Sequence, residues 1–377
     1  LFNAGGTVVI QNGSLITGNN SANGGGIQNS SFGSITIDNS TVSLNTSTGN
    51  GGGLRSTGGT VTIRNGSLID QNTAALTGGG MSVTSGTLDV DDSTVSGNTT
   101  TGGTAGGIYT GGTATVTNSL ISDNTALGEG GGIFSNGTLT VDGLSEVSGN
   151  NAILGGGIRS GLLGSLTIDN ATISGNTATG DLEGEGGGGI FNAGGTVTIQ
   201  NNAVISGNMA TGDEGSGGGI FNAAGGTVTV TGASISGNSA SQAGGGVYVS
   251  GSSTTVINSS VLQSNTAGED GGGLWNSSTG IMILRNATLL DGNIASGAAA
   301  NQGGGGIFND GGRLALQSGT TLTANLANGL AGSGGGILTR GGIVTLDDSA
   351  LSGNTAGGNG GGIEMVTGTL ELRNSSL

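Results

Sequence analysis

The chain has 377 residues, of which 89 are glycine, and it contains no proline, cysteine or histidine. This much glycine without proline excludes a collagen triple helix. The formal net charge of −16, with arginine as the only basic residue type, argues against a cationic surface for nucleic acid or anionic lipid. No apolar run approaches the roughly 20 residues that a membrane-spanning helix needs, so we expect no membrane insertion.

An internal repeat of about 27 residues runs along the chain. Each repeat begins with a glycine run and one aliphatic residue, and three short alternating segments with Gly and Asn turns follow, as in residues 190–208. This pattern predicts an all-β, right-handed parallel β-helix with three short strands per coil and about 13 coils. The aliphatic residues that open the repeats are Leu1, Ile27, Leu54, Met81, Ile108, Ile133, Ile158, Ile190, Ile220, Val247, Leu274, Ile307, Ile337 and Ile363.

An asparagine follows each of these residues, except the last, after some 16 to 19 positions. We expect these asparagines to form an internal ladder of side-chain amides and to adopt the left-handed conformation of a sharp corner. The third residue before each of them is always aliphatic, which predicts an inward column because an unpaired buried charge is costly. The ladder asparagines are Asn19, Asn45, Asn72, Asn98, Asn124, Asn150, Asn176, Asn208, Asn238, Asn265, Asn293, Asn325 and Asn354.

A second turn column lies after the second segment of the repeat. It holds asparagine in six coils and Asp or Gly in others, such as Asp92 and Gly143. Exchange among these three residue types is typical of a turn position with positive φ. The asparagines of this column are Asn39, Asn65, Asn118, Asn170, Asn258 and Asn286.

The glycine run Gly187–Ile190 and the element Ile173-Ser174-Gly175-Asn176 alternate in this form along nearly the whole chain. This pairing resembles the GGA(I/L/V) and FxxN repeats of the polymorphic outer-membrane proteins, a family of autotransported adhesins. The resemblance implies a β-helix, display at the cell surface or outside the cell, and adhesion. It supplies no catalytic residues.

Eight of the nine aromatic residues occupy one column, directly after the aliphatic residue of the glycine run. Arg, Gln, Ser and Glu fill the same position in other coils, which predicts an outward, exposed stripe that stacks on sugars or packs on a neighbouring molecule. The alternative is that the rings stack on one another or are covered by a flanking segment. The residues are Phe2, Tyr109, Phe134, Phe191, Phe221, Tyr248, Trp275 and Phe308.

The second segment of many repeats carries two threonines two residues apart, as in Thr60 with Thr62 and Thr113 with Thr115. A flat Thr-x-Thr array resembles the ice-binding face of β-solenoid antifreeze proteins, which makes ice binding a further alternative. Threonine is also a favoured outward residue in any strand. Val9, Asp89, Arg313 and Glu371 interrupt the array.

Length variation is concentrated between the ladder asparagine and the next glycine run, where acidic residues also gather. Insertions at one edge of a solenoid often mark its binding edge, and carboxylates are ligands for Ca²⁺. The spacing matches no known calcium loop, so we expect no metal site or other cofactor, with Ca²⁺ as a weak candidate. The candidate calcium ligands are Asp181, Glu183, Glu185, Asp213, Glu214, Glu269 and Asp270.

The sequence offers no histidine, lysine or cysteine for catalysis. Its adjacent acids, such as Asp91 and Asp92, stand at turn positions. We therefore predict an extracellular structural or adhesive solenoid that serves as a filament or stalk and is not an enzyme, with a polysaccharide lyase or hydrolase as the alternative. We expect residues 1–377 to form one β-helix domain, a segment of a longer chain or a filament subunit. This domain associates with itself end to end or side by side, and it contacts glycans or the surface of a host or neighbouring cell.

Overall fold

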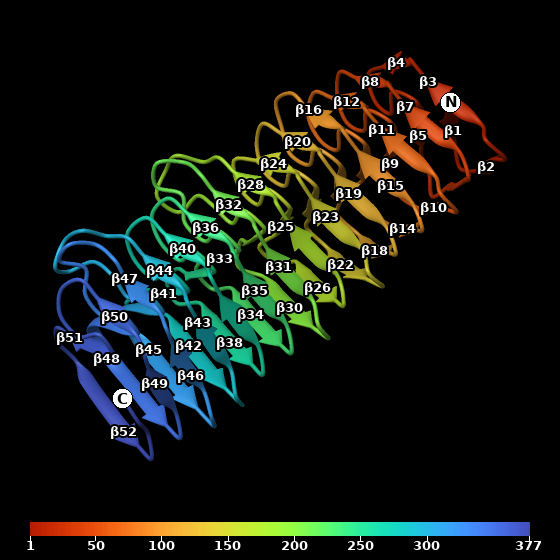
Figure 1. Ribbon diagram of the computed structural model, residues 1–377. Helices are drawn as coiled ribbons and strands as arrows, with labels where there is room; N and C mark the ends of the chain where they lie inside the picture. Colours follow the sequence, from red (N-terminus) through yellow and green to blue (C-terminus); the bar gives the residue numbers. More distant parts are fainter. The chain divides into compact units, whose positions relative to one another are not determined.

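The computed structural model describes all 377 residues and contains 52 β-strands and no helix. It therefore offers no helix that could span a bilayer. The chain divides into two compact units, unit 1 (Leu1–Thr177) and unit 2 (Ala178–Leu377). Within each unit the coils lie one above another, and strands at equivalent positions of successive coils pair in parallel (Figure 1). The predicted parallel β-solenoid is confirmed.

Fourteen coils begin with a glycine run or its equivalent, one more than we counted from the sequence. They build three sheets, but not one from each expected segment: the first two segments both lie in one sheet, and most coils have four strands instead of the three that we expected. Most complete coils contribute two strands to the first sheet (sheet A), one to the second (sheet B) and one to the third (sheet C). The strand in sheet C has only two residues, follows the ladder asparagine directly, and was not foreseen from the sequence.

In unit 1 the strands of sheet A are β1 (Phe2–Asn3), β2 (Thr7–Gln11), β5 (Ile27–Asn29), β6 (Ser34–Asp38), β9 (Leu54–Ser56), β10 (Thr60–Arg64), β13 (Met81–Val83), β14 (Thr87–Asp91), β17 (Ile108–Thr110), β18 (Thr113–Thr117), β21 (Ile133–Ser135), β22 (Thr138–Asp142), β25 (Ile158–Ser160) and β26 (Ser165–Asp169). Those of sheet B are β3 (Leu15–Thr17), β7 (Thr41–Ser43), β11 (Leu68–Asp70), β15 (Thr94–Ser96), β19 (Leu120–Ser122), β23 (Glu146–Ser148) and β27 (Thr172–Ser174). Those of sheet C are β4 (Asn20–Ser21), β8 (Thr46–Ser47), β12 (Thr73–Ala74), β16 (Thr99–Thr100), β20 (Thr125–Ala126) and β24 (Asn151–Ala152), and β28 (Thr177–Ala178) contains the boundary between the units.

In unit 2 the strands of sheet A are β29 (Ile190–Asn192), β30 (Thr196–Gln200), β33 (Ile220–Asn222), β34 (Thr227–Thr231), β37 (Val247–Val249), β38 (Thr254–Asn258), β41 (Leu274–Asn276), β42 (Ile281–Arg285), β45 (Ile307–Gln317), β48 (Ile337–Asp347), β51 (Ile363–Met365) and β52 (Thr369–Arg373). Those of sheet B are β31 (Val204–Ser206), β35 (Ser234–Ser236), β39 (Val261–Gln263), β43 (Leu289–Asp291), β46 (Thr321–Thr323) and β49 (Ala350–Ser352). Those of sheet C are β32 (Met209–Ala210), β36 (Ser239–Ala240), β40 (Thr266–Ala267), β44 (Ile294–Ala295), β47 (Leu326–Ala327) and β50 (Thr355–Ala356).

The apolar core lies between the three sheets of each unit. The aliphatic residues of the glycine runs from Ile27 to Ile337 are buried, as are the aliphatic residues three positions before the ladder asparagine from Val42 to Leu351. The predicted inward column three positions before the ladder asparagine is thus confirmed, and the aliphatic residues of the glycine runs form a second inward column. In sheet C the inward position is held by small residues such as Ala74 and Ala240.

The small residues of sheet C belong to a corner where backbones approach closely. A Cβ on Gly25, the middle glycine of its run, would lie 2.5 Å from the carbonyl oxygen of Thr46 in sheet C of the same coil. A Cβ on Gly26 would lie 3.0 Å from the side-chain amide of Asn45. The glycine run is therefore needed because the corner has no room for side chains.

The asparagine ladder is confirmed in both units. In unit 1 each side-chain nitrogen from Asn19 to Asn150 donates to the side-chain oxygen of the next ladder asparagine at 2.9–3.0 Å. In unit 2 the same bonds run from Asn208 to Asn354. The second amide hydrogen of Asn72 goes to the carbonyl oxygen of Val42, and its backbone N–H donates to Asn98. Such bonding makes a buried amide acceptable in an apolar interior.

The conformation that we expected of the ladder asparagines is wrong. None of them has positive φ, and the left-handed residue is the one before each of them, such as Leu44, Gln71 or Gly97. The asparagine has to keep an extended backbone because its own N–H donates to the next ladder amide and sheet C starts with the next residue. The second turn column does have positive φ at Asn39, Asn65, Asn118, Asn170 and Asn286, whereas at Asn258 the following residue, Ser259, takes the left-handed conformation.

Two coils of unit 2 differ from the rest in sheet A. In most coils the two strands of this sheet are separate, but in β45 and β48 they merge into single strands of 11 residues. The segments Gly311-Gly312 and Gly341-Gly342 lie within these strands, and the pairing of the two strands shifts register there. Sheet A is therefore continuous across its width in these two coils.

Candidate functional site

The aromatic column does not form the exposed stripe that we expected. Phe134, Phe191, Phe221 and Phe308 are buried, and Tyr109, Tyr248 and Trp275 are half-buried. Phe2 alone is well exposed, at 65%. The alternative that we left open, mutual stacking of the rings, accounts for this difference.

The rings of unit 2 form one continuous stack. Successive ring centroids from Phe191 through Phe221, Tyr248 and Trp275 to Phe308 lie 4.9, 4.8, 4.3 and 6.1 Å apart. Parallel pairing in register places each ring over the next because neighbouring strands are about 4.8 Å apart. Both faces of the three middle rings are therefore occupied by other rings, which leaves only their edges for a ligand.

An arginine ends the aromatic stack in each unit. The Arg159 guanidinium lies 4.4 Å from the ring centroid of Phe134, which stacks on Tyr109 at 5.5 Å in unit 1. In unit 2 the Arg340 guanidinium lies 4.6 Å from the ring centroid of Phe308. Arg159 is itself a member of the column, and its cation–π contact explains why arginine is compatible there, whereas Arg340 reaches Phe308 from two residues beyond Leu338, the column residue of its coil.

A pocket lies beside the aromatic stack of unit 2, next to its two polar rings, Tyr248 and Trp275. This pocket has a volume of about 320 Å³ and lies at the corner where the loops between sheet C and the glycine runs vary in length. The carboxylates of Glu183, Glu214, Glu269, Asp270 and Asp310 line it, with Arg340 as the one basic residue. We call it the acidic pocket. It carries an excess of negative charge that its own residues do not neutralise.

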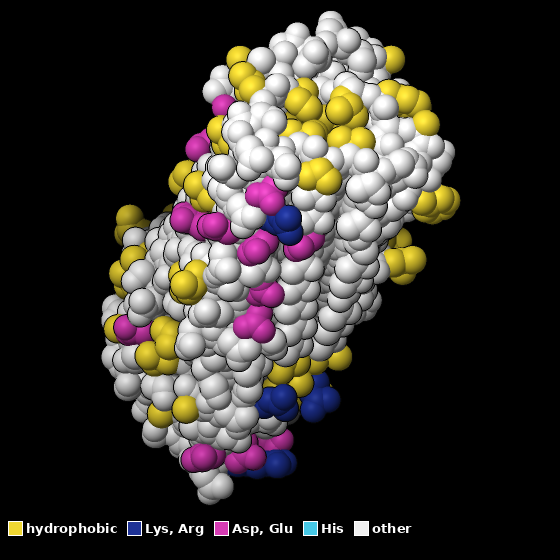
Figure 2. Space-filling view, turned by 90° about the vertical axis from the view of Figure 1, so that its right-hand side faces the viewer, with side chains coloured by type: hydrophobic (Ala, Val, Ile, Leu, Met, Phe, Trp, Pro, Cys, Tyr) yellow, Lys and Arg dark blue, Asp and Glu magenta, His cyan; other side chains and the backbone are white.

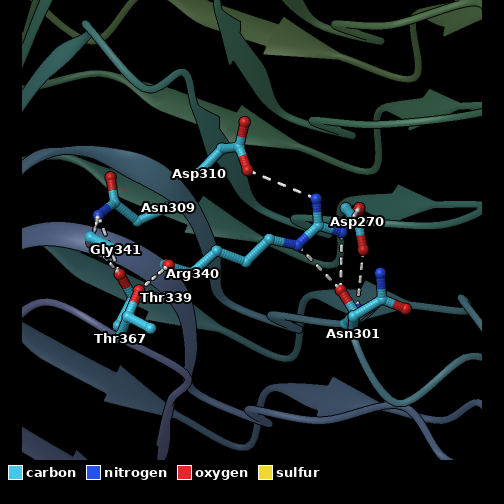
Figure 3. Close-up of polar contacts among 9 residues, drawn as sticks. Asp270, Asn301, Asn309, Asp310, Thr339, Arg340, Gly341 and Thr367 are labelled. Carbon is cyan, nitrogen blue, oxygen red and sulfur yellow. Dashed lines mark hydrogen bonds and ion pairs between the residues drawn. The ribbon is translucent and has the colours of Figure 1, made fainter.

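Arg340 joins the rim of the acidic pocket to the loop before the glycine run of β45. Its Nη2 and Nε donate to the carbonyl oxygen of Asn301 at 2.8 and 3.3 Å, and its Nη1 lies 3.4 Å from a carboxylate oxygen of Asp310 (Figure 3). Nη2 lies 3.6 Å from a carboxylate oxygen of Asp270, whose other oxygen accepts the N–H of Gly303 at 2.8 Å. The guanidinium thus fixes one loop and two carboxylates at once.

Burial and negative charge shift the ionisation of two groups in this pocket. Burial raises the pKa of the Asp270 carboxyl to about 6, although the Gly303 N–H and Arg340 act in the opposite direction. Burial, and then the charges of Glu183 and Asp310, raise the pKa of the Tyr248 hydroxyl. Tyr248 therefore stays a neutral hydroxyl at ordinary pH.

The candidate calcium ligands are only partly brought together. Glu183, Glu214, Glu269 and Asp270 line the acidic pocket, and Asp181, Glu185 and Asp213 do not. No group of three carboxylates has the arrangement that would hold a metal ion. Calcium binding has no ligand set to support it and stays a prediction.

The threonine pairs lie in register in sheet A. Thr113 and Thr115 pair with Thr138 and Thr140 in the next coil, and Thr196 and Thr198 pair with Thr227 and Thr229 in unit 2. Asp89 stands opposite Thr115 and interrupts the rows in unit 1. Burial, and then Asp91 and Asp142, raise the pKa of this carboxyl.

The structure also contains a second column of buried polar residues that the sequence did not lead us to expect. It lies two positions after the aliphatic residue of the glycine run, where Asn192 donates to Asn222 at 2.9 Å and Asn276 to Asn309 at 2.7 Å. Ser and Thr replace asparagine there in other coils, as at Ser56 and Thr339. The alignment that revealed the first ladder carries this signal too, because asparagine recurs after GIF, GIQ and GLW.

No known protein family, no curated protein and no solved structure matches the chain. The resemblance to polymorphic outer-membrane proteins therefore has no support beyond the fold. The chain is an all-β parallel β-solenoid with an asparagine ladder in each of its two units.

Proposed function

We propose that the chain is an extracellular structural and adhesive solenoid that uses the acidic pocket of unit 2 as its contact site. The observation that carries the proposal is the charge of this pocket, in which five carboxylates face one arginine beside the edges of two aromatic rings. The ladders and stacks give the coils a stiff interior, which suits a protein that holds a contact site in place.

The chemistry of the acidic pocket favours a cationic partner group, an ammonium or a guanidinium. Carboxylates bind such groups through charge-assisted hydrogen bonds. A neutral sugar ring is disfavoured because the faces of Tyr248 and Trp275, on which it would stack, are covered by neighbouring rings. Adhesion through this pocket would thus depend on lysine, arginine or amino groups of the partner surface.

The experiment measures binding of a hexa-arginine peptide and of an array of neutral, acidic and amino glycans to the immobilised chain. The variant Glu183→Gln/Glu214→Gln removes two exposed pocket charges, and the matched control Glu146→Gln removes an exposed charge from unit 1. We expect binding of the peptide and of amino glycans to fall about tenfold in the pocket variant and to stay unchanged in the control. Equal weakening in both, or no binding to the wild-type chain, would reject the proposal.

A polysaccharide-cleaving activity is the second candidate, and one observation favours it. Asp270 has a pKa of about 6, which suits a general acid, and it lies among other carboxylates in a pocket. Against this, Gly303 and Arg340 engage both of its oxygens. Release of reducing ends or unsaturated products from acidic and neutral polysaccharides by the wild-type chain, but not by Asp270→Asn, would establish the activity.

A further inference from the structure

One part of sheet A in unit 2 is exposed and apolar. Its outward positions on β42, β45 and β48 hold Ile281, Ile283, Arg285, Arg313 and Ile343, which we call the Ile–Arg strip. Ile281 is 38% exposed and Ile343 is 53% exposed. Ile281, Arg313 and Ile343 also line a shallow depression of about 300 Å³.

The strip departs from the pattern of the rest of the sheet. Ile281 pairs with Thr254 on one side and with Arg313 on the other, and Arg313 pairs with Ile343. In earlier coils of unit 2 the same position is Thr196 or Thr227. At this position three adjacent coils replace threonine with Ile281, Arg313 and Ile343, and exposed apolar patches mark contact surfaces.

The two arginines of the strip are exposed and none of the chain's salt bridges uses them. The surface of the chain is otherwise mainly neutral or acidic, and Figure 2 shows hydrophobic and arginine side chains next to one another in the lower part of one face. Arginine beside apolar residues is a composition typical of protein interfaces. The strip therefore calls for a partner that is both acidic and able to cover isoleucine.

The acidic pocket of a second copy meets this requirement. Pocket and strip meet on the two continuous strands: β45 carries Asp310 in the pocket and Arg313 in the strip only three residues, about 10 Å, further on, and β48 carries Arg340 and Ile343. When two such faces meet about a two-fold axis that runs along the stack of coils, the strip of each copy lies opposite the pocket of the other. One symmetric contact then brings both pairs of complementary surfaces together.

We propose that two copies of this chain pair side by side through this face of sheet A in unit 2. Arg285 and Arg313 of each copy lie at the acidic pocket of the other, and the isoleucines of the strip are covered. This inference rests on the proposed function, because it names a second copy as the cationic partner of the same pocket. It differs from that function in requiring the strip as well.

The test measures the dissociation constant of the dimer by sedimentation equilibrium for the full chain. We expect Arg313→Glu and Ile281→Thr/Ile343→Thr each to raise the dissociation constant at least about tenfold, and higher salt to raise that of the wild type. Val9→Thr is the matched control, since Val9 is 53% exposed on sheet A of unit 1 and its replacement should change nothing. Threonine occupies these positions in other coils, so the variants should fold.

Charge exchange separates the two hypotheses. The single variant Glu214→Arg should weaken pairing of the chain with itself. An equimolar mixture of the Glu214→Arg and Arg313→Glu chains should restore pairing. A wild-type chain that stays monomeric at about 100 μM, or a dimer that the strip variants leave unchanged, would overturn the inference. If the monomeric chain still binds hexa-arginine through Glu183 and Glu214, the proposed function stands and only the dimer is rejected. If the monomeric chain binds no hexa-arginine, the proposed function and the dimer are both rejected.

Discussion

Units 1 and 2 have the same kind of asparagine ladder and apolar core, but they differ in the aromatic column. Unit 1 stacks two rings, Tyr109 and Phe134, under Arg159, which makes an ion pair with Glu129 at 2.8 Å. Unit 2 stacks five rings under Arg340, and two carboxylates and a loop carbonyl share that arginine. The acidic pocket lies beside the longer stack.

The comparison teaches that one position of the repeat serves two purposes. Between the polar residues Gln28 and Ser82, Arg55 at this position is only half-buried. Where several successive coils carry rings and the corner loops are long, the same position becomes part of a second, outer apolar layer. Burial at this position thus depends on its neighbours along the stack more than on its own coil.

The largest expected effect tests the burial difference between the two stacks. Phe221 lies between two rings and is 1% exposed, so Phe221→Ala should lower the free energy of unfolding by about 3–5 kcal/mol. Tyr109 ends its stack half-buried, and Tyr109→Ala should lower it by only about 1–2 kcal/mol. Urea denaturation followed by circular dichroism measures both. Equal losses would show that the outer layer of unit 2 is no better packed than that of unit 1.

The next effect concerns pH and belongs to unit 2. Asp270, beside Glu269, Asp310 and Arg340, holds its proton up to a pH of about 6 in the folded chain, because burial raises its pKa. In the unfolded chain it holds the proton only below about 4. Between these values the folded state binds more protons, so the contribution of Asp270 to stability falls as the pH rises from about 4 to about 7, by about 2 kcal/mol.

The variant Asp270→Asn isolates this contribution. The difference in unfolding free energy between wild type and variant, measured by urea denaturation from pH 4.5 to 7.5, should fall with rising pH. A difference that is flat or that rises would show that Arg340 and the Gly303 N–H outweigh the burial of the carboxylate.

The smallest effect concerns the start of the glycine run. Ala105 of unit 1 has φ +61° where other coils place glycine, and this conformation strains a residue with a Cβ. Ala105→Gly should therefore stabilise the chain by about 1 kcal/mol. The reverse change in unit 2, Gly244→Ala, should destabilise it by more than that, because the new Cβ would lie 2.7 Å from the carbonyl oxygen of Val247. Thermal unfolding of both variants checks the pair, and a loss in Ala105→Gly would contradict the strain.

Much of the fold could be predicted from the repeat. The columns that begin at Ile27 and Val42 never carry charge, and residues that recur at one position of successive coils stack on one another. The ladder followed from the same reasoning. The strand of sheet C was missed because two residues, such as Thr73 and Ala74, are too few to show an alternating pattern.

The candidate site was harder to predict. The alternation within a strand correctly places Phe221 on the outer face of its own coil. The ring is nevertheless buried, because Phe191 and Tyr248 of the neighbouring coils cover it. The acidic pocket depends on where loops of irregular length place Glu183 and Glu214. Loop conformation of this kind does not follow from a repeat pattern.

The asparagine ladders also have a direction. In every bond of both ladders the amide hydrogen belongs to the coil nearer the N-terminus and the accepting oxygen to the coil nearer the C-terminus. The dipoles of the side-chain amides therefore add along each unit instead of cancelling, and each bond polarises the next. A ladder therefore ends in an amide oxygen on its N-terminal side and in an amide N–H group on its C-terminal side. The two ends have opposite partial charges, so they differ chemically even where the coils are the same.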